Sequence, residues 1–186
     1  SYGAFRTPYQ TVTYLSCHDD WTLWDKLVST MDPKKNYTGC QKNILRANRL
    51  AAAINFCCQG RPFFLAGEEF GRTKGGIKNS FCSSSEVNQL DWTRAWKNRD
   101  LVDYYRGLIA FRKAHPTLRL TTDEAVREQV HAMEGLEPNV VGFRLRGCAD
   151  DPAAAIIVLY NPNRTPTTVQ LPKGRWNVCI ADQTSG

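Results

Sequence analysis

The chain of 186 residues lacks the features that mark several large classes of protein. None of its seven cysteines pairs with another in a CxxC spacing, which argues against a zinc site and against a disulfide scaffold. No apolar run approaches a membrane span, and the first residues lack the apolar core of a signal peptide. Gly75-Gly76 beside Lys74 lacks the GKS/T pattern of a phosphate-binding loop. No internal repeat or low-complexity tract is present.

The net charge of +6 raises the question of nucleic-acid binding. The basic residues are scattered, however, and no basic stripe is interleaved with aromatic side chains, so a solvated surface is the better interpretation. With 42% hydrophobic and 23% charged residues, the composition is ordinary for a globular protein. Unpaired thiols favour a reducing compartment, so we expect the cytoplasm rather than secretion, with no membrane or nucleic-acid partner.

The first part of the sequence predicts the order strand, helix, strand. Apolar residues 11–15 indicate a buried strand, and apolar positions at helical spacing predict a helix over residues 41–58. A short apolar strand is predicted at 63–66, directly before Gly67-Glu68-Glu69. Such an order, with polar residues at the end of each strand, is typical of a βαβ unit with parallel strands.

Three further elements surround this unit. Residues 22–27 predict a short helical turn, and apolar spacing predicts a second helix over residues 100–115, which ends before Pro116 with His115 as a C-terminal cap. Residues 71–98 form a long loop rich in Gly, Ser, Asn and Lys. Loops of this length inside compact domains are usually functional.

The last third of the chain predicts an antiparallel β domain. The boundary lies near residues 116–125, after which the apolar period changes from 3.6 to 2. Residues 141–146 alternate between apolar and polar, and residues 156–160 are apolar on both faces, which predicts a central strand. Alternation in residues 167–171 and 176–180 predicts further strands.

The most informative stretch is residues 14–20 (YLSCHDD), which places His18 and Asp19 at the end of the first predicted strand. In parallel α/β sheets the working residues sit at the carboxyl ends of the strands. The dipeptide alone favours a hydrogen-bonded pair without chemistry. Trp21 and Trp24 offer flat faces for sugar rings, but they are equally consistent with core positions, and the sequence leaves both alternatives open.

Glu68 and Glu69 resemble paired catalytic carboxylates. Adjacent residues on a strand point to opposite faces, so they cannot easily flank one bond. We therefore expect a structural role, or a salt bridge to Arg72 or Lys74, for at least one of them.

Several segments match one family together. They are residues 14–20, 59–69 (QGRPFFLAGEE), 72–74 (RTK), 79–81 (NSF), 87–92 (VNQLDW), 105–116, 139–145 and 160–163. With these segments the chain resembles the α-amylase superfamily, glycoside hydrolase family 13, and within it the type I pullulanases. Residues 14–20 and 59–69 resemble the family's seventh and eighth barrel strands.

The resemblance implies an α/β fold followed by an all-β part. Residues 1–118 would supply the last two βα units of a TIM (β/α)₈ barrel, and residues 119–186 an incomplete antiparallel C-terminal β-sandwich. A whole barrel takes about 250 residues. The chain is therefore expected to be a piece cut at both ends, without the nucleophile and general acid of the earlier strands, and inactive alone.

The implied reaction is retaining hydrolysis of α-1,6 branch linkages in pullulan, starch or glycogen-like glucans. This chemistry needs two carboxyl groups about 5–5.5 Å apart. Asp19 matches a third carboxylate, which stabilises the transition state, and His18 matches a histidine that hydrogen-bonds the same sugar. Asp20, Trp21 and Asn79 are the further expected substrate contacts. The expected partners are an α-glucan or branched maltooligosaccharide and the rest of the same polypeptide.

The chain departs from the family at three positions: Asp20 replaces the usual Asn, Phe81 a Tyr and Ser85 an Asp. We expect a bacterial-type enzyme that needs no cofactor and no catalytic metal; a structural Ca²⁺ is compatible with the resemblance but is not supported by these residues. Two alternatives stay open. One is an isoamylase-type glycogen debranching enzyme, and the other is a non-catalytic α-glucan-binding module.

Overall fold

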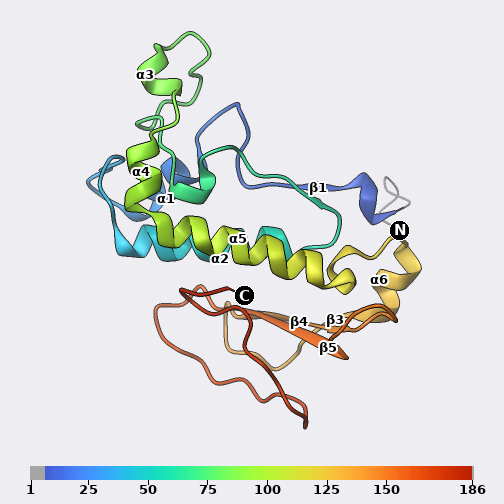
Figure 1. Cartoon of the computed structure of the whole chain (residues 1–186). Helices are drawn as coiled ribbons and strands as arrows, with labels where there is room; N and C mark the ends of the chain where they lie inside the picture. Colours follow the sequence, from blue (N-terminus) through green and yellow to red (C-terminus); the bar gives the residue numbers. More distant parts are fainter. Residues whose placement is uncertain (1–6, 186) are drawn as a thin grey trace.

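The computed structural model describes residues 7–185 and combines helices with a short parallel strand pair and an antiparallel sheet (Figure 1). None of the helices in these residues has the length and apolar content needed to cross a bilayer. The elements, in chain order, are η1 Pro8–Gln10, β1 Val12–Thr13, α1 Leu23–Met31, α2 Lys42–Cys57, β2 Arg61–Pro62, η2 Glu68–Phe70, α3 Ser85–Asn88, α4 Trp92–Lys97, α5 Arg99–Ala114, η3 Pro116–Arg119, α6 Asp123–Gln129, β3 Val130–Ala132, β4 Val141–Arg146 and β5 Ala155–Tyr160.

The parallel pairing expected from the sequence is confirmed, because β1 pairs with β2 in parallel register. Both strands are shorter than expected, and the strand predicted at residues 63–66 is wrong. The N–H of Phe63 still donates to the carbonyl of Thr13 (2.8 Å), but the N–H of Leu65 donates to the Glu68 carboxyl (2.7 Å). A side chain therefore replaces the next ladder bond, and the strand ends there.

The two long helices form where their apolar spacing predicts them. Helix α2 matches the expected range 41–58, and α5 matches 100–115. They lie side by side in Figure 1 and share one buried core. Its members are Ala52, Ala53, Phe56, Leu101, Tyr104, Tyr105 and Leu108. Packing of these two apolar stripes, rather than intrinsic propensity, accounts for the stability of this layer.

The segments around these helices contain more helix than the sequence predicts. The helical turn expected at residues 22–27 is the start of α1, whose N-cap hydroxyl, that of Thr22, accepts a hydrogen bond from the N–H of Asp25. The loop expected at 71–98 contains the short helices α3 and α4. Asp91 caps α4 by accepting from the N–H groups of Thr93 and Arg94, as acidic N-caps do.

The antiparallel sheet has the order β3-β4-β5, so β4 is central. The prediction of a central strand at 156–160 is wrong in this respect, since β5 lies at the edge of the described sheet. Residues 161–185 form no strand, only a bridge between Ile180 and Ser185, although strands were expected at 167–171 and 176–180. Ile180 of this segment packs against the buried clusters, whereas Val178 is 83% exposed.

The helices and the sheet meet in a second buried cluster. It consists of Cys57 from α2, Leu118 from η3, Leu145 from β4 and Ile156 from β5. His115 ends α5 as expected, and its Nδ1 lies 2.8 Å from the Asp151 carboxylate in the β4–β5 connection. The sheet therefore packs against the lower side of α5 in Figure 1.

Candidate functional site

The candidate site lies where the chain leaves β1, in residues 16–21, which we call the β1 turn. His18 and Asp19 extend from it into solvent: the side chains are 85% and 78% exposed, and Nε2 of His18 lies 3.3 Å from an Asp19 carboxylate oxygen. Both groups are therefore accessible to a ligand. Their position after a parallel strand agrees with the sequence-based expectation.

Asp20 reverses the chain directly after this pair. Its φ of +62° lies in the left-handed region, which residues other than glycine rarely adopt. The ammonium of Lys74 donates to the Asp20 carbonyl (2.7 Å) and to the carbonyl of Lys78 (3.1 Å). One side chain thus joins the β1 turn to the segment that leads into Asn79.

The two candidate tryptophans have different surroundings. Trp21 is half-buried; its indole N–H donates to the Gly76 carbonyl (2.7 Å), and the ammonium of Lys78 lies 4.4 Å from the ring centroid. Trp24 is 1% exposed, its N–H donates to the Tyr37 carbonyl, and it belongs to a buried cluster. Trp24 is therefore a core residue, while Trp21 remains beside the site.

Asn79 is exposed and lies between two anchored neighbours. The Lys78 carbonyl is held by Lys74, and the buried Ser80 hydroxyl donates to the side chain of Asn88 (2.8 Å). The structure therefore brings His18, Asp19, Asp20 and Trp21 together in one turn, and it links that turn to the approach to Asn79.

The carboxyl groups of Glu68 and Glu69 bind different partners. The Glu68 carboxyl is buried and accepts from the Ser16 hydroxyl (2.9 Å) and the Leu65 N–H (2.7 Å), while Glu69 accepts from the Gly67 N–H (2.8 Å). The expected structural role is confirmed for Glu68. The alternative, a salt bridge to Arg72 or Lys74, is wrong.

Both of those cations bond to main-chain carbonyls instead. Arg72 donates to Ala66 and Asn88, and Lys74 donates to Asp20 and Lys78. Lys74 contributes to the site but was not among the residues predicted from the sequence. The only signal for it was the RTK segment itself, since a buried lysine cannot be recognised from spacing.

The Glu68 carboxyl predicts a pH dependence of stability. Burial raises its pKa from 4.5 to about 7, against hydrogen bonds from Leu65 and Ser16 that lower it. Between these two pH values the folded chain keeps a proton that the unfolded chain has lost. The free energy of unfolding should therefore fall as pH rises through this window, by on the order of 1–3 kcal/mol.

Denaturant unfolding of the chain at a series of pH values between about 4.5 and 8 measures this fall. Glu68→Gln cannot ionise and should lose this share of the decline, whereas Glu124→Gln, at an exposed position on α6, should keep it. Identical pH profiles for the two variants would contradict the assignment.

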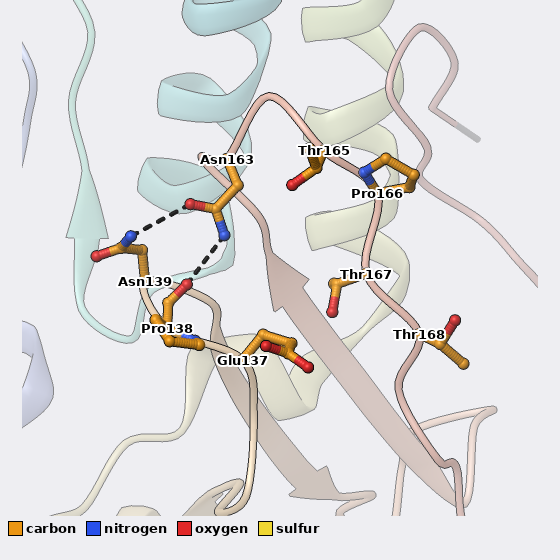
Figure 2. A pocket seen from close by; sticks show the side chains of 8 residues that line it. All are labelled: Glu137, Pro138, Asn139, Asn163, Thr165, Pro166, Thr167 and Thr168. Atoms are coloured by element: carbon orange, nitrogen blue, oxygen red, sulfur yellow. Dashed lines mark hydrogen bonds between the residues drawn. The ribbon is translucent and has the colours of Figure 1, made fainter.

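Two hollows lie away from the β1 turn. A cavity of about 370 Å³ is lined by Thr38, Cys40, Arg72, Thr73, Glu86, Gln89, Asp91, Arg94, Lys97 and Asn98. Another, of about 480 Å³, lies beside the β4–β5 sheet, where Asn163 bonds to Asn139 and to the Pro138 carbonyl (Figure 2). Neither is lined by His18, Asp19, Asp20, Trp21 or Asn79.

A metal site is not apparent either: between residues 7 and 185 no three His, Cys, Asp or Glu side chains gather as ligands. All seven cysteines are free. Hydrolysis of a glycosidic bond needs a pair of carboxyl groups flanking it. The β1 turn offers the exposed carboxylate of Asp19 with the His18 imidazole beside it, an arrangement that can stabilise positive charge on a ligand.

Comparisons with known proteins show which proteins this chain is similar to. Residues 126–184 match the family model "Pullulanase, all-beta domain". A pullulanase from Bacillus subtilis (strain 168) is 36% identical over 166 residues, which are 89% of this chain and 22% of the relative. An isoamylase from Flavobacterium sp. is 28% identical, covering 84% of this chain and 25% of the relative.

Solved structures give the same result. A pullulanase from Bacillus acidopullulyticus superposes with a TM-score of 0.88 and 36% identity over 97% of this chain and 22% of its own. A pullulanase from Paenibacillus barengoltzii, in complex with maltohexaose and alpha-cyclodextrin, has a TM-score of 0.79 and 43% identity over 89% of this chain and 25% of its own. The chain spans about a fifth to a quarter of the length of these proteins.

Proposed function

Since this chain belongs to the pullulanases, glycosidases of the α-amylase family that debranch α-glucans, we propose that it forms part of a retaining hydrolase of α-1,6-glucosidic linkages. Its substrate would be pullulan, starch or a glycogen-like glucan. The observation that carries the proposal is the exposed His18–Asp19 pair in the turn that follows the parallel strand β1. Solved relatives complexed with maltohexaose or maltotetraose support an α-glucan or branched maltooligosaccharide as the ligand.

In this proposal Asp19 stabilises the transition state. As the glycosidic bond breaks, the sugar ring develops oxocarbenium character, and a carboxylate close to its hydroxyls favours that charge. His18 donates to the same sugar, and Asp20, Trp21 and Asn79 make further contacts. These side chains orient the substrate but do not break the bond.

The bond-breaking groups belong to the remaining polypeptide. We propose that residues 1–118 complete a (β/α)₈ barrel as its last two βα units and that residues 119–186 form part of a β-sandwich. Residues 1–6 and 186 of these ranges lie outside the described residues. The nucleophile and the general acid then come from other barrel strands, and the isolated chain is inactive. No cofactor is required, because paired carboxyl groups suffice for this chemistry.

We propose the cytoplasm as its compartment, on the strength of the seven free thiols. No membrane or nucleic-acid partner is part of the proposal. Selective alkylation of the thiols in intact cells and in lysate, followed by mass spectrometry, would test the reduced state.

The choice between pullulanase and isoamylase activity is tested on the full-length protein. We expect rapid release of reducing ends from pullulan and slower release from glycogen, since pullulanases are its more similar relatives. A reducing-sugar assay at equal glucan mass measures both rates, with the isolated chain as the inactive control. Hydrolysis of glycogen without hydrolysis of pullulan would favour the isoamylase alternative.

A further inference from the structure

Lys74 carries a buried charge that no carboxylate neutralises. The residue is 4% exposed, and among residues 7–185 no acidic oxygen lies within 4.0 Å of its ammonium. Its hydrogen bonds go to the carbonyls of Asp20 and Lys78. Burial of an ammonium is costly unless its hydrogen bonds are satisfied, and carbonyls alone compensate poorly. The two accepting carbonyls belong to the β1 turn and to the segment before Asn79, so the buried ammonium links two parts of the site.

The bond to Asp20 acts on a strained position. A non-glycine residue in the left-handed region persists only where its surroundings fix it. At Asp20, with φ of +62°, the ammonium of Lys74 on the carbonyl supplies such a constraint at 2.7 Å. Because Asp20 follows Asp19 directly, the same turn sets the direction of the exposed Asp19 carboxylate.

The backbone of Lys74 is also held in place by hydrogen bonds. Its backbone N–H donates to the Asp25 carboxylate (2.8 Å), and the hydroxyl of Thr73 donates to the other oxygen of that carboxylate. Asp25 is fully buried in the first turn of α1. The reach of the ammonium is therefore fixed relative to the helix that follows the β1 turn.

We propose that Lys74 is a positioning residue, whose ammonium holds the β1 turn and the approach to Asn79 in the geometry that substrate needs. The inference rests on the proposed function, since it concerns the same site. Lys74 does not touch the sugar; it acts through the Asp20 and Lys78 carbonyls. Misplacement of a catalytic group by about 1 Å can cost 10²-fold in rate.

In the full-length enzyme, Lys74→Met should lower kcat on pullulan by roughly 10- to 100-fold and change KM by less than about threefold. Lys97→Met, at an exposed position on α4, is the control and should keep both constants. Lys74→Gln retains N–H donors without the charge and should lose less kcat than the methionine variant. Circular dichroism and thermal melting identify variants that are unfolded at the assay temperature.

A double-mutant cycle separates positioning from general destabilisation. Glycine adopts the left-handed region freely, so in an Asp20→Gly background the further change Lys74→Met should cost less than about threefold. An equal loss in both backgrounds, a loss confined to KM, or an unchanged kcat would overturn the inference. If instead Asp19→Ala retains full turnover, the proposed function itself fails, whatever the cycle gives.

Discussion

Asp19→Ala in the full-length enzyme is expected to lower kcat on pullulan by roughly 10³-fold, with a much smaller change in KM. Groups aimed at charge that develops in the transition state act on kcat rather than on ground-state binding. Asp19 is suited to this because its carboxylate is 78% exposed in the β1 turn, where it pairs with the exposed His18. Steady-state kinetics on pullulan give both constants.

Two further variants sharpen this result. Asp19→Asn keeps the shape of the side chain and its carbonyl acceptor, so a similar loss would assign the effect to the negative charge. Asp103→Ala removes an exposed carboxylate of α5, which pairs with Arg106 on the surface, and should leave kcat unchanged. Full turnover by Asp19→Ala would exclude Asp19 as the transition-state stabiliser.

The parts of the fold that the sequence predicts well are those whose pattern and packing partner lie within one long element. Helices α2 and α5 begin and end within one residue of the expected positions, because each has a continuous apolar stripe that faces the other. The parallel order of β1 and β2 followed from the helix-length segment between them. Length and periodicity therefore sufficed for these elements.

The missing strands have a different cause. Residues 167–171 and 176–180 alternate as strands do, but alternation states only which face is apolar and does not supply a hydrogen-bonding partner. In the described structure β5 is the last strand of its sheet, and the segment after it extends over the surface. Strand prediction from one sequence fails where the neighbouring strand is decided by tertiary contacts.

The sequence predicts the exposed residues of the site but not the buried residues that hold them. The position of His18, Asp19 and Asp20 after a strand can be read from the order of residues, and their proximity in one turn follows. The residues that hold this turn in place cannot be predicted from the order of residues. Glu68 reaches Ser16 across 52 positions and Lys74 reaches Asp20 across 54, and both are buried charged residues that composition assigns to the surface.

The largest expected effect on stability is at Arg112, a buried residue of α5. Its guanidinium donates to the carbonyls of Phe56, Cys58 and Gly60, each at 2.7 Å. These carbonyls lie at and just beyond the C-terminus of α2, where the helix itself provides no donors. Arg112→Met should lower the free energy of unfolding by about 3–5 kcal/mol, because buried carbonyls lose charged donors. Denaturant unfolding of the chain measures the change.

Arg106→Met provides the matched control on the same helix. Arg106 is exposed and pairs with Asp103 at 2.9 Å, and such surface pairs contribute about 0–1 kcal/mol. Equal stabilities of the two variants would mean that water can replace the Arg112 donors at the end of α2. A large loss confined to Arg112→Met would instead identify this side chain as the cap that joins α2, α5 and the start of β2, the strand beside the one that carries the β1 turn.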